Sequence, residues 1–541
     1  MSAHGSKPLV VIGGGMTGLS TALTWACHQD AHARPVIVLE KQPIVGGFVT
    51  SFRRKGFLFD TTQLVPDISW ALRRFGIDLE MVRMPGDCIR LFLADPVSDT
   101  TRSIGIPADL DGFRTLLTRL HPEELGPIHR FLESSSELFR EVKQLKLEPS
   151  ILDLLWIAAT CPHVMQTRNQ TFQQYVDSFG MRGSDIREVL GAFALFSALP
   201  GERVAAALGS SVLQSMMRGA WRPRGGFIEL PLRMRKRLLE LGGVLRTGAL
   251  VDRILTNRGR VTGVRLSDGE LIETDHVVTT IDPKVAMGRL VGDDVLRSID
   301  RTYADKVESM RMTMSSMSIH LGLDDRIDLS SLGLGAAYNV LTTGGGTYEW
   351  LFRAAERGAS DFSEDCFQVS VVCPSLAIGG KPTMTLRVIP MAIGDWAELR
   401  ARNPQEYQRR KNAVADFFIE RVEQYLVPGL RSHIVVRDVA TPATFARYSG
   451  SPTGSNYDMA PYPDNFGRNR LRMRTPIRGL FQPEFSHGVW PSLLAGMQAV
   501  DALLDGKVLG GKAMGDNMEA SIRAPRSPTR EAPTSLMRVG T

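Results

Sequence analysis

Three glycines near the N-terminus have the spacing of a pyrophosphate-binding turn. Gly13, Gly15 and Gly18 form G-x-G-x-x-G directly after an apolar run of strand length, and helix-forming residues begin at Met16. The first glycine allows a tight turn, the second lets a pyrophosphate approach the backbone, and the third lets the helix pack closely on the strand. The first helical residues, Met16 and Thr17, then offer free N–H groups to phosphate. The pattern predicts a dinucleotide site.

An acidic residue follows at the distance that ribose recognition requires. The apolar run 36–39 ends in Glu40, about twenty residues past the turn, where a ribose hydroxyl needs an acceptor. Lys41 directly after it is assigned to the same site. Strand, turn, helix, strand and acid fall in register, which favours nucleotide binding over a glycine-rich turn in an ordinary α/β protein.

The segment after Glu40 separates a flavin from a nicotinamide cofactor. It contains Gly46-Gly47, followed by SFRRKGFLFD at residues 51–60. This combination resembles the extended FAD signature of the phytoene desaturase-like flavoproteins, a superfamily of carotenoid desaturases, carotenoid cis-trans isomerases and retinol saturases. The resemblance implies that the glycine pair lets the chain pass close to the ribityl and pyrophosphate groups of FAD. It also implies a basic residue near phosphate, with Arg54 as the candidate and a solvated turn as an equal alternative.

Further blocks carry the same resemblance along the chain. The sequence PRGGF at 223–227 precedes an amphipathic helix, the segment 372–376 looks like the isomerase and saturase branch, and the segment 441–448 resembles the block of the family that leads back to the flavin. By resemblance, Val251 contacts the adenine region of FAD through its backbone, and the alternative is an ordinary strand valine. The matched blocks extend over residues 7–505, so the resemblance covers the whole fold.

The resemblance implies a fold class and an order of domains. The fold is α/β: a Rossmann-like FAD-binding domain with three layers and a parallel sheet, and an inserted α+β substrate domain, in the glutathione-reductase-2-like flavoprotein architecture. The expected segments are the first FAD-binding part at 1–66, a helical substrate part at 67–222, a second FAD-binding part at 223–300, the substrate sheet and helix at 301–440, a C-terminal FAD-binding part at 441–506, and a disordered tail at 507–541.

The stretch 478–496 departs from the family pattern. Its flanks match, but its middle is shorter and carries Trp490 where small residues are usual. Either Gln482 or Glu484 takes the polar role toward the ribityl and phosphate groups. Trp490 restricts access to the flavin, stacks on a ligand or packs against the following helix. His487 invites an acid/base role, but a histidine in a turn is more often a hydrogen-bonding residue, so no catalytic histidine is predicted.

Composition excludes several function classes. The 541 residues include 43% hydrophobic and 23% charged residues, as in an ordinary soluble protein. The net charge of +6 favours anionic lipid surfaces or acidic ligands, and without a nucleic-acid motif it does not indicate nucleic acid. The five cysteines are scattered without metal-ligand spacing, which predicts no metal site and a reducing compartment. Without a signal peptide or a spanning segment, we expect a cytoplasmic protein, with peripheral contact on the inner face of a membrane left open.

Two apolar stretches, 151–161 and 189–221, allow two interpretations. They form walls of a hydrophobic substrate tunnel with a lip that dips into lipid, or they are plain core helices. Both are too short or too interrupted to cross a membrane.

The expected function is that of an FAD-dependent oxidoreductase on a hydrophobic polyene such as a carotenoid or retinoid. Desaturation, saturation and redox-neutral isomerisation all remain open. The cofactor carries this chemistry, so no catalytic residue is assigned. One alternative is a degenerate member that acts as a binding or assembly subunit with weak or no flavin. Another is a flavin amine oxidase-like enzyme. The sequence does not give the oligomeric state.

Overall fold

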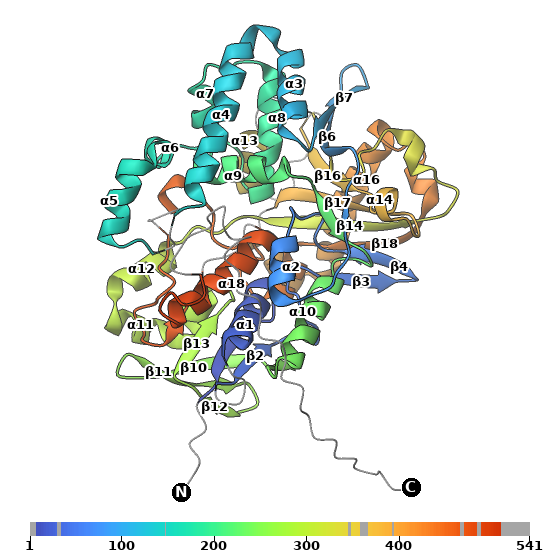
Figure 1. Cartoon of the computed structure of the whole chain (residues 1–541). Helices are drawn as coiled ribbons and strands as arrows, with labels where there is room; N and C mark the ends of the chain where they lie inside the picture. Colours follow the sequence, from blue (N-terminus) through green and yellow to red (C-terminus); the bar gives the residue numbers. More distant parts are fainter. Residues whose placement is uncertain are drawn as a thin grey trace, which may run out of the picture.

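The computed structural model describes residues 7–29, 34–145, 148–343, 348–357, 366–391, 394–465, 470–483 and 488–509. A parallel sheet with its helices forms one end of the molecule, and a larger mixed sheet with a layer of helices forms the other (Figure 1). The α/β fold with a parallel sheet, predicted from the sequence, is confirmed.

The parallel sheet is assembled from three distant parts of the chain. Its order is β19-β13-β1-β2-β9, and each pair of neighbours is parallel. The central strand is at most 4% exposed, as expected for a parallel sheet covered on both faces. The strands are β1 (Leu9–Ile12), β2 (Val36–Glu40), β9 (Val244–Thr247), β13 (His276–Thr279) and β19 (Leu480–Phe481).

Helices cover one face of this sheet. The closest packing joins α1 to α18 at Gly496, where a Cβ would lie 2.6 Å from the carbonyl oxygen of Thr17. Leu9 and Val11 of β1 point into the apolar core formed with these helices. The helices are α1 (Met16–His28), α2 (Ser69–Phe75), α10 (Glu229–Glu240) and α18 (Val489–Leu503).

The opposite face packs against a small antiparallel sheet and a group of helices. Val10 and Ile12 of β1 point into this second core, which completes three layers. The order of the small sheet is β10-β11-β12. Its elements and their neighbours are β10 (Val251–Asn257), β11 (Arg260–Leu266), β12 (Leu271–Glu273), the π-helix η3 (Lys284–Gly292), α11 (Asp293–Ile299) and α12 (Arg301–Ser309).

The second part of the molecule is built on a seven-stranded sheet of order β18-β14-β17-β16-β15-β6-β7. Only β15 and β6 pair in parallel within it. The apolar residues of one face form a core with α16. The strands are β6 (Asp87–Asp95), β7 (Thr100–Pro107), β14 (Ser315–Leu323), β15 (Asn339–Thr342), β16 (Gln368–Val372), β17 (Thr383–Met391) and β18 (Ile434–Ala440).

The helices around this sheet include a separate layer at the top of Figure 1. Aromatic and aliphatic side chains of α3, α4, α7, α8 and α9 form its core. The helices of this part are α3 (Leu110–Leu120), α4 (Leu125–Val142), α5 (Ile151–Thr160), α6 (Pro162–Thr167), α7 (Phe172–Asp177), α8 (Ser184–Ala194), α9 (Ala206–Met216), α13 (Glu349–Arg357), α14 (Ser375–Ile378), α15 (Gly394–Arg402), α16 (Pro404–Tyr425) and α17 (Pro442–Ser449). Short 3₁₀ turns lie at η1 (Pro122–Glu124), η2 (Leu195–Ser197), η4 (Leu329–Leu332), η5 (Leu430–His433) and η6 (Pro463–Asn465).

The two apolar stretches noted in the sequence differ in their surroundings. The stretch 189–221 contains the second half of α8 and all of α9. The apolar side chains of both helices are buried in the core. The stretch 151–161 instead forms α5, in which only Ile157 is buried. The core interpretation therefore holds for the second stretch and is wrong for the first. No helix among the described residues has both the length and the apolar character needed to cross a bilayer.

Two small two-stranded sheets are connected to each other by an ion pair. Strands β3 (Ser51–Arg54) and β4 (Phe57–Asp60) form an antiparallel hairpin, and β5 (Met81–Arg83) pairs antiparallel with the distant β8 (Trp221–Pro223). In the buried ion pair between the two sheets, Arg222 Nη2 lies 2.5 Å from Asp60 Oδ2.

Candidate functional site

The glycine turn after β1 has the geometry that the sequence predicts. Gly13 has a φ of 104°, and its N–H donates to the carbonyl oxygen of Leu39 at 2.9 Å. A Cβ at Gly18 would collide with the carbonyl oxygen of Gly13. Gly18 therefore allows α1 to approach β1, and Gly13 adopts a backbone conformation that favours glycine.

The second glycine segment lies directly against the first. The N–H of Gly46 donates to the carbonyl oxygen of Gly14 at 2.8 Å, and a Cβ at Gly47 would lie 3.4 Å from the Cα of Gly15. Gly15 is the N-cap of α1 and no side chain caps that end, so the helix N-terminus at Met16 offers its N–H groups. Two backbones without side chains in front of a helix N-terminus form a cradle for phosphate.

Glu40 lies beside this cradle and is held by the backbone. Its Oε2 accepts from the N–H of Gly14 at 2.7 Å, and its Oε1 accepts from the N–H of Gln42 at 2.7 Å. The residue is 7% exposed. Each carboxylate oxygen keeps a further lone pair, so the group can still accept from ribose hydroxyls. The carbonyl oxygen of Glu40 accepts from Ala249 at 2.9 Å, which brings the buried Val251 at the start of β10 near the predicted ribose position.

Of the two predicted basic residues, Lys41 lies near the site and Arg54 does not. Lys41 is half-buried, and burial lowers the pKa of its ammonium group. A Cβ at Gly450 would lie 2.5 Å from its Nζ, so the chain after α17 packs over it. Arg54 is exposed on β3 and pairs with Asp438 of β18 at 3.0 Å. The structure therefore does not bring Arg54 together with the glycine turn.

Gln482 follows β19 and is 2% exposed. Its Nε2 donates to the carbonyl oxygen of Ile281 at 3.1 Å, while its Oε1 is buried with no hydrogen-bond partner among the described residues. A buried carbonyl oxygen without a donor is costly, and a ribityl hydroxyl of FAD would satisfy it. The unpartnered Oε1 makes Gln482 suited to the polar role that the sequence left open between two residues, and the assignment stays a prediction. The other one, Glu484, lies outside the described residues, as does His487.

Trp490 packs within the protein. Its ring lies edge-to-face on that of Trp70 of α2, with centroids 5.6 Å apart and an interplanar angle of 64°. The expectation that it packs against the following helix is therefore corrected, because Trp490 belongs to α18, which begins at Val489, and packs on α2.

A pair of carboxyl groups lies near the end of β13 and was not signalled by the sequence. Asp282 Oδ2 accepts from Ser451 Oγ at 2.5 Å, and its Oδ1 accepts from the N–H of Lys284 at 2.8 Å. Burial and the negative charge of Asp282 raise the pKa of Asp458 to about 7, although Ser455 Oγ donates to it at 3.4 Å. The two acids are far apart in the chain, so no local spacing could have indicated this pair.

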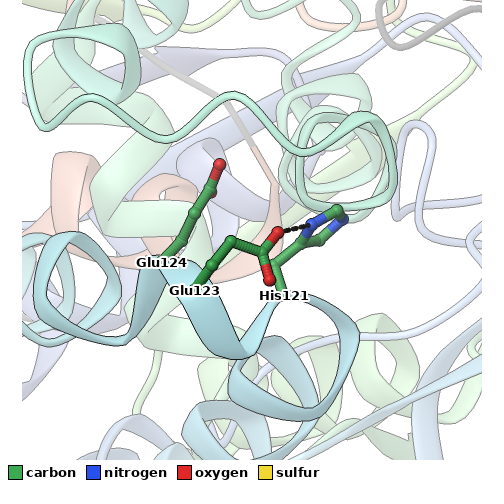
Figure 2. A group of neighbouring side chains, drawn as sticks. All are labelled: His121, Glu123 and Glu124. Carbon is green, nitrogen blue, oxygen red and sulfur yellow. Dashed lines mark hydrogen bonds and ion pairs between the residues drawn. The ribbon is translucent and has the colours of Figure 1, made fainter.

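One group of metal-capable side chains lies elsewhere, between α3 and α4. His121 Nδ1 and Glu123 Oε1 are 2.9 Å apart, and Figure 2 shows Glu124 extending to one side of them. Glu124 Oε1 accepts from the N–H groups of Arg182 and Gly183, at 2.8 and 3.1 Å. This acid holds the chain in front of α8, so the group has a structural explanation.

The comparison with known families agrees with this geometry. Residues 16–416 match the family described as flavin containing amine oxidoreductase. The matched region covers most of the chain. The chain belongs to this family.

Its curated relatives also include the proteins that the sequence resembles. Phytoene dehydrogenase of Streptomyces griseus is 26% identical over 551 residues, covering 96% of this chain and 97% of that protein. Prolycopene isomerase of Daucus carota is 25% identical over 493 residues, covering 87% and 75%. Lycopene-forming phytoene desaturase of Pseudescherichia vulneris is 25% identical over 470 residues, covering 84% and 89%. The resemblance to phytoene desaturase-like flavoproteins is confirmed.

Solved structures of low identity establish the fold. A variant of putrescine oxidase superimposes with a TM-score of 0.60 at 14% identity, covering 92% of this chain and 100% of that chain. An oxidoreductase from Methanosarcina mazei gives a TM-score of 0.56 at 16% identity, covering 91% and 100%. With the family match and the phosphate cradle, the cofactor is FAD, and the chain is an FAD-dependent oxidoreductase or a related isomerase.

The glycine contacts predict the effect of adding a single methyl group. We expect Gly18→Ala to weaken FAD binding at least about tenfold, because α1 must move away from the carbonyl oxygen of Gly13. The matched control is Gly288→Ala, since a Cβ there meets nothing within 4 Å. FAD content after gel filtration and thermal unfolding with added FAD measure the effect. Equal FAD affinity in both variants would contradict this account of the turn.

The carboxyl pair predicts a pH dependence of stability. The folded protein keeps Asp458 protonated up to about pH 7, whereas the unfolded chain releases this proton near 3.8. Its contribution to the free energy of unfolding is therefore present at low pH and is lost as the pH rises from about 4 to about 7, by on the order of 4 kcal/mol. Asp458→Asn should remove this part of the pH dependence. Urea unfolding of both proteins at about pH 5 and pH 8 measures it, and parallel pH profiles would refute the assignment.

Proposed function

We propose that the chain is an FAD-dependent desaturase, saturase or isomerase that acts on a hydrophobic polyene of the carotenoid or retinoid type. This proposal depends on one observation: the chain is similar to a phytoene dehydrogenase over nearly its full length. The aligned region covers 96% of this chain. The site supports it, because the glycine cradle, Glu40 and Gln482 supply backbone and polar groups where FAD requires them.

The residues of this chain have positioning roles in such a reaction. Bound FAD supplies hydride acceptance and donation at its ring system. The cradle between Gly15 and Gly47 binds the pyrophosphate, and Glu40 fixes the ribose. Gln482 orients the ribityl chain through its free Oε1.

The test of this proposal begins with the spectrum of the purified protein. We expect oxidised flavin bands and near-stoichiometric release of FAD on denaturation. Glu40→Ala should lower the affinity for FAD about tenfold, because a charged acceptor for ribose is lost. Turnover is then measured with phytoene, prolycopene and putrescine, under oxidising and reducing conditions. Turnover of a polyene supports the proposal and its product gives the direction of electron flow. Turnover of putrescine alone would favour an amine oxidase, and a protein that takes up no FAD would favour a binding subunit.

We further propose that α5 docks the protein on an anionic membrane surface. Among its residues, Ile151, Leu152 and Leu155 are 78%, 76% and 63% exposed. The helix lies at the left edge of the molecule in Figure 1, and a capping box between Ser150 and Asp153 fixes its start. Apolar residues clustered so densely on a surface indicate an interaction site, and the net charge of +6 favours anionic lipid. Because the proposed substrate is hydrophobic, a lipid surface is the appropriate place from which the protein takes up the substrate.

A charge placed on α5 should prevent this docking. We expect the double variant Leu152→Glu, Leu155→Glu to lose most of its binding to vesicles of mixed neutral and anionic phospholipid, at least about tenfold. Val97→Glu is the control, because Val97 is a single exposed apolar residue at 95% exposure on a loop between strands. Vesicle sedimentation measures the bound fraction, with circular dichroism to verify folding. Equal binding of wild type and the double variant would exclude α5 as the docking element.

A further inference from the structure

The two faces of the seven-stranded sheet differ in chemistry, although both are buried. Leu386 and Val388 of β17 are at most 1% exposed and pack in the apolar core with α16. Residues alternate sides along a strand, so Arg387 between them points to the opposite face. Its direct neighbours across the strands are Ser318 and Ser370. The buried polar residues of these three strands are Ser315, Ser316, Ser318, His320, Gln368, Ser370, Thr383 and Thr385.

Arg387 reaches from this face to the FAD-binding part of the chain. Its Nη2 donates to Asn456 Oδ1 at 2.8 Å, and its Nη1 donates to the carbonyl oxygen of Thr61 at 3.3 Å. Thr61 in turn donates through Oγ1 to the carbonyl oxygens of Phe48 and Thr50. The guanidinium therefore contacts the segment after β4, and Thr61 connects this segment to the loop that follows the Gly46-Gly47 pair.

The charge of Arg387 is not neutralised within the described part of the chain. Both of its acceptors are neutral, no described carboxylate lies within 4 Å of it, and its Nε is buried without a hydrogen-bond partner. A half-buried cation without a counter-ion is costly, because its lost hydration is only partly replaced. A protein keeps such an unpaired cation, in spite of its cost, where a ligand of opposite charge binds and neutralises it.

The neighbours of Arg387 are suited to an anion. Burial lowers the pKa of His320 to about 4, so its ring is neutral at pH 7 and does not compete as a cation. Burial also raises the pKa values of Tyr338 and Tyr457, and the positive charge of Arg387 opposes this rise in both. Both hydroxyls therefore remain protonated at neutral pH.

We infer that Arg387 binds a carboxylate at one end of an otherwise apolar, unsaturated substrate, so that the substrate class is a polyenoic acid rather than a pure hydrocarbon. This inference rests on the proposed function and names the substrate class of the same site. The phosphates of FAD are not the anion in question, because they belong at the N-terminus of α1 beside Gly13 and Gly15. A second source of negative charge is the reduced flavin ring, and the experiment below separates the two.

The test compares an acid with its uncharged ester in the FAD-loaded protein. Isothermal titration calorimetry at pH 8 measures the affinity for retinoic acid and for its methyl ester. In the wild type, the acid should bind about 10- to 100-fold more tightly than the ester, as expected for a charge-assisted pair with arginine. Arg387→Gln should abolish this ratio by weakening acid binding alone, and Arg387→Lys should keep part of it. The control is Arg437→Gln on β18, because Arg437 is exposed and paired with Asp416 of α16.

Each outcome decides the inference. Equal affinity for acid and ester in the wild type, or equal weakening of both in Arg387→Gln, overturns it. The reduction potential of the flavin is measured in the same proteins. A changed potential with an unchanged acid-to-ester ratio assigns Arg387 to the flavin ring and also overturns the inference. FAD content is recorded separately: a protein without FAD refutes the proposed function, while calorimetry on that protein still decides whether Arg387 selects the acid.

Discussion

The buried ion pair between Asp60 and Arg222 fixes the arrangement on which the cofactor site depends. The side chain of Arg222 is fully buried and that of Asp60 is 5% exposed. Asp60 also accepts from Ser51 Oγ and from the N–H of Phe227 at 2.9 Å, and Arg222 donates to the carbonyl oxygen of Gln63. Removal of either charged partner would leave the other buried and uncompensated, at a cost of about 3 to 5 kcal/mol. The pair therefore permits only one juxtaposition of two segments far apart in the chain.

That juxtaposition extends to the phosphate cradle. Phe227 lies two residues before α10, and α10 packs on α1 in the same apolar core. Pro231 of α10 lies so close to Gly46 that a Cβ there would come within 2.9 Å of its Cγ. The backbone of Gly46 is in turn bonded to Gly14. The ion pair thus positions α10, α10 confines the second glycine segment, and this segment forms one wall of the cradle.

The sequence predicts those parts of the structure that depend on neighbouring residues. The glycine turn, the helix that begins at Met16 and the position of Glu40 follow from local spacing and apolar periodicity, which no distant contact overrides. Arg54 could not be placed in this way, because its partner Asp438 comes from a distant strand. The choice of Gln482 likewise depends on the pairing of β19 with β13 and on the carbonyl of Ile281. The apolar run 151–161 resembles a core helix in composition, and only the tertiary fold shows that no element among the described residues covers it. The domain boundaries stay a prediction.

The polar face of the seven-stranded sheet has a physical reason if the substrate is apolar along most of its length. A sheet buried on both faces is usually apolar on both, because each unsatisfied polar group in an apolar interior costs about 1 to 3 kcal/mol. On this face the polar side chains largely satisfy one another: His320 bonds Thr385 at 3.2 Å, and Asn456 accepts from both Ser316 and Arg387. Among the residues that the structure describes, Arg387 retains an unsatisfied donor and has no counter-ion. A pure hydrocarbon has no group that pairs with such a charge. A terminal carboxylate would pair with it, and this contact would fix the position of the otherwise uniform polyene chain along the site. The apolar contacts along a polyene are nearly unchanged when it slides by one double bond, so a charged anchor at one end is the feature that selects which bond lies against the flavin.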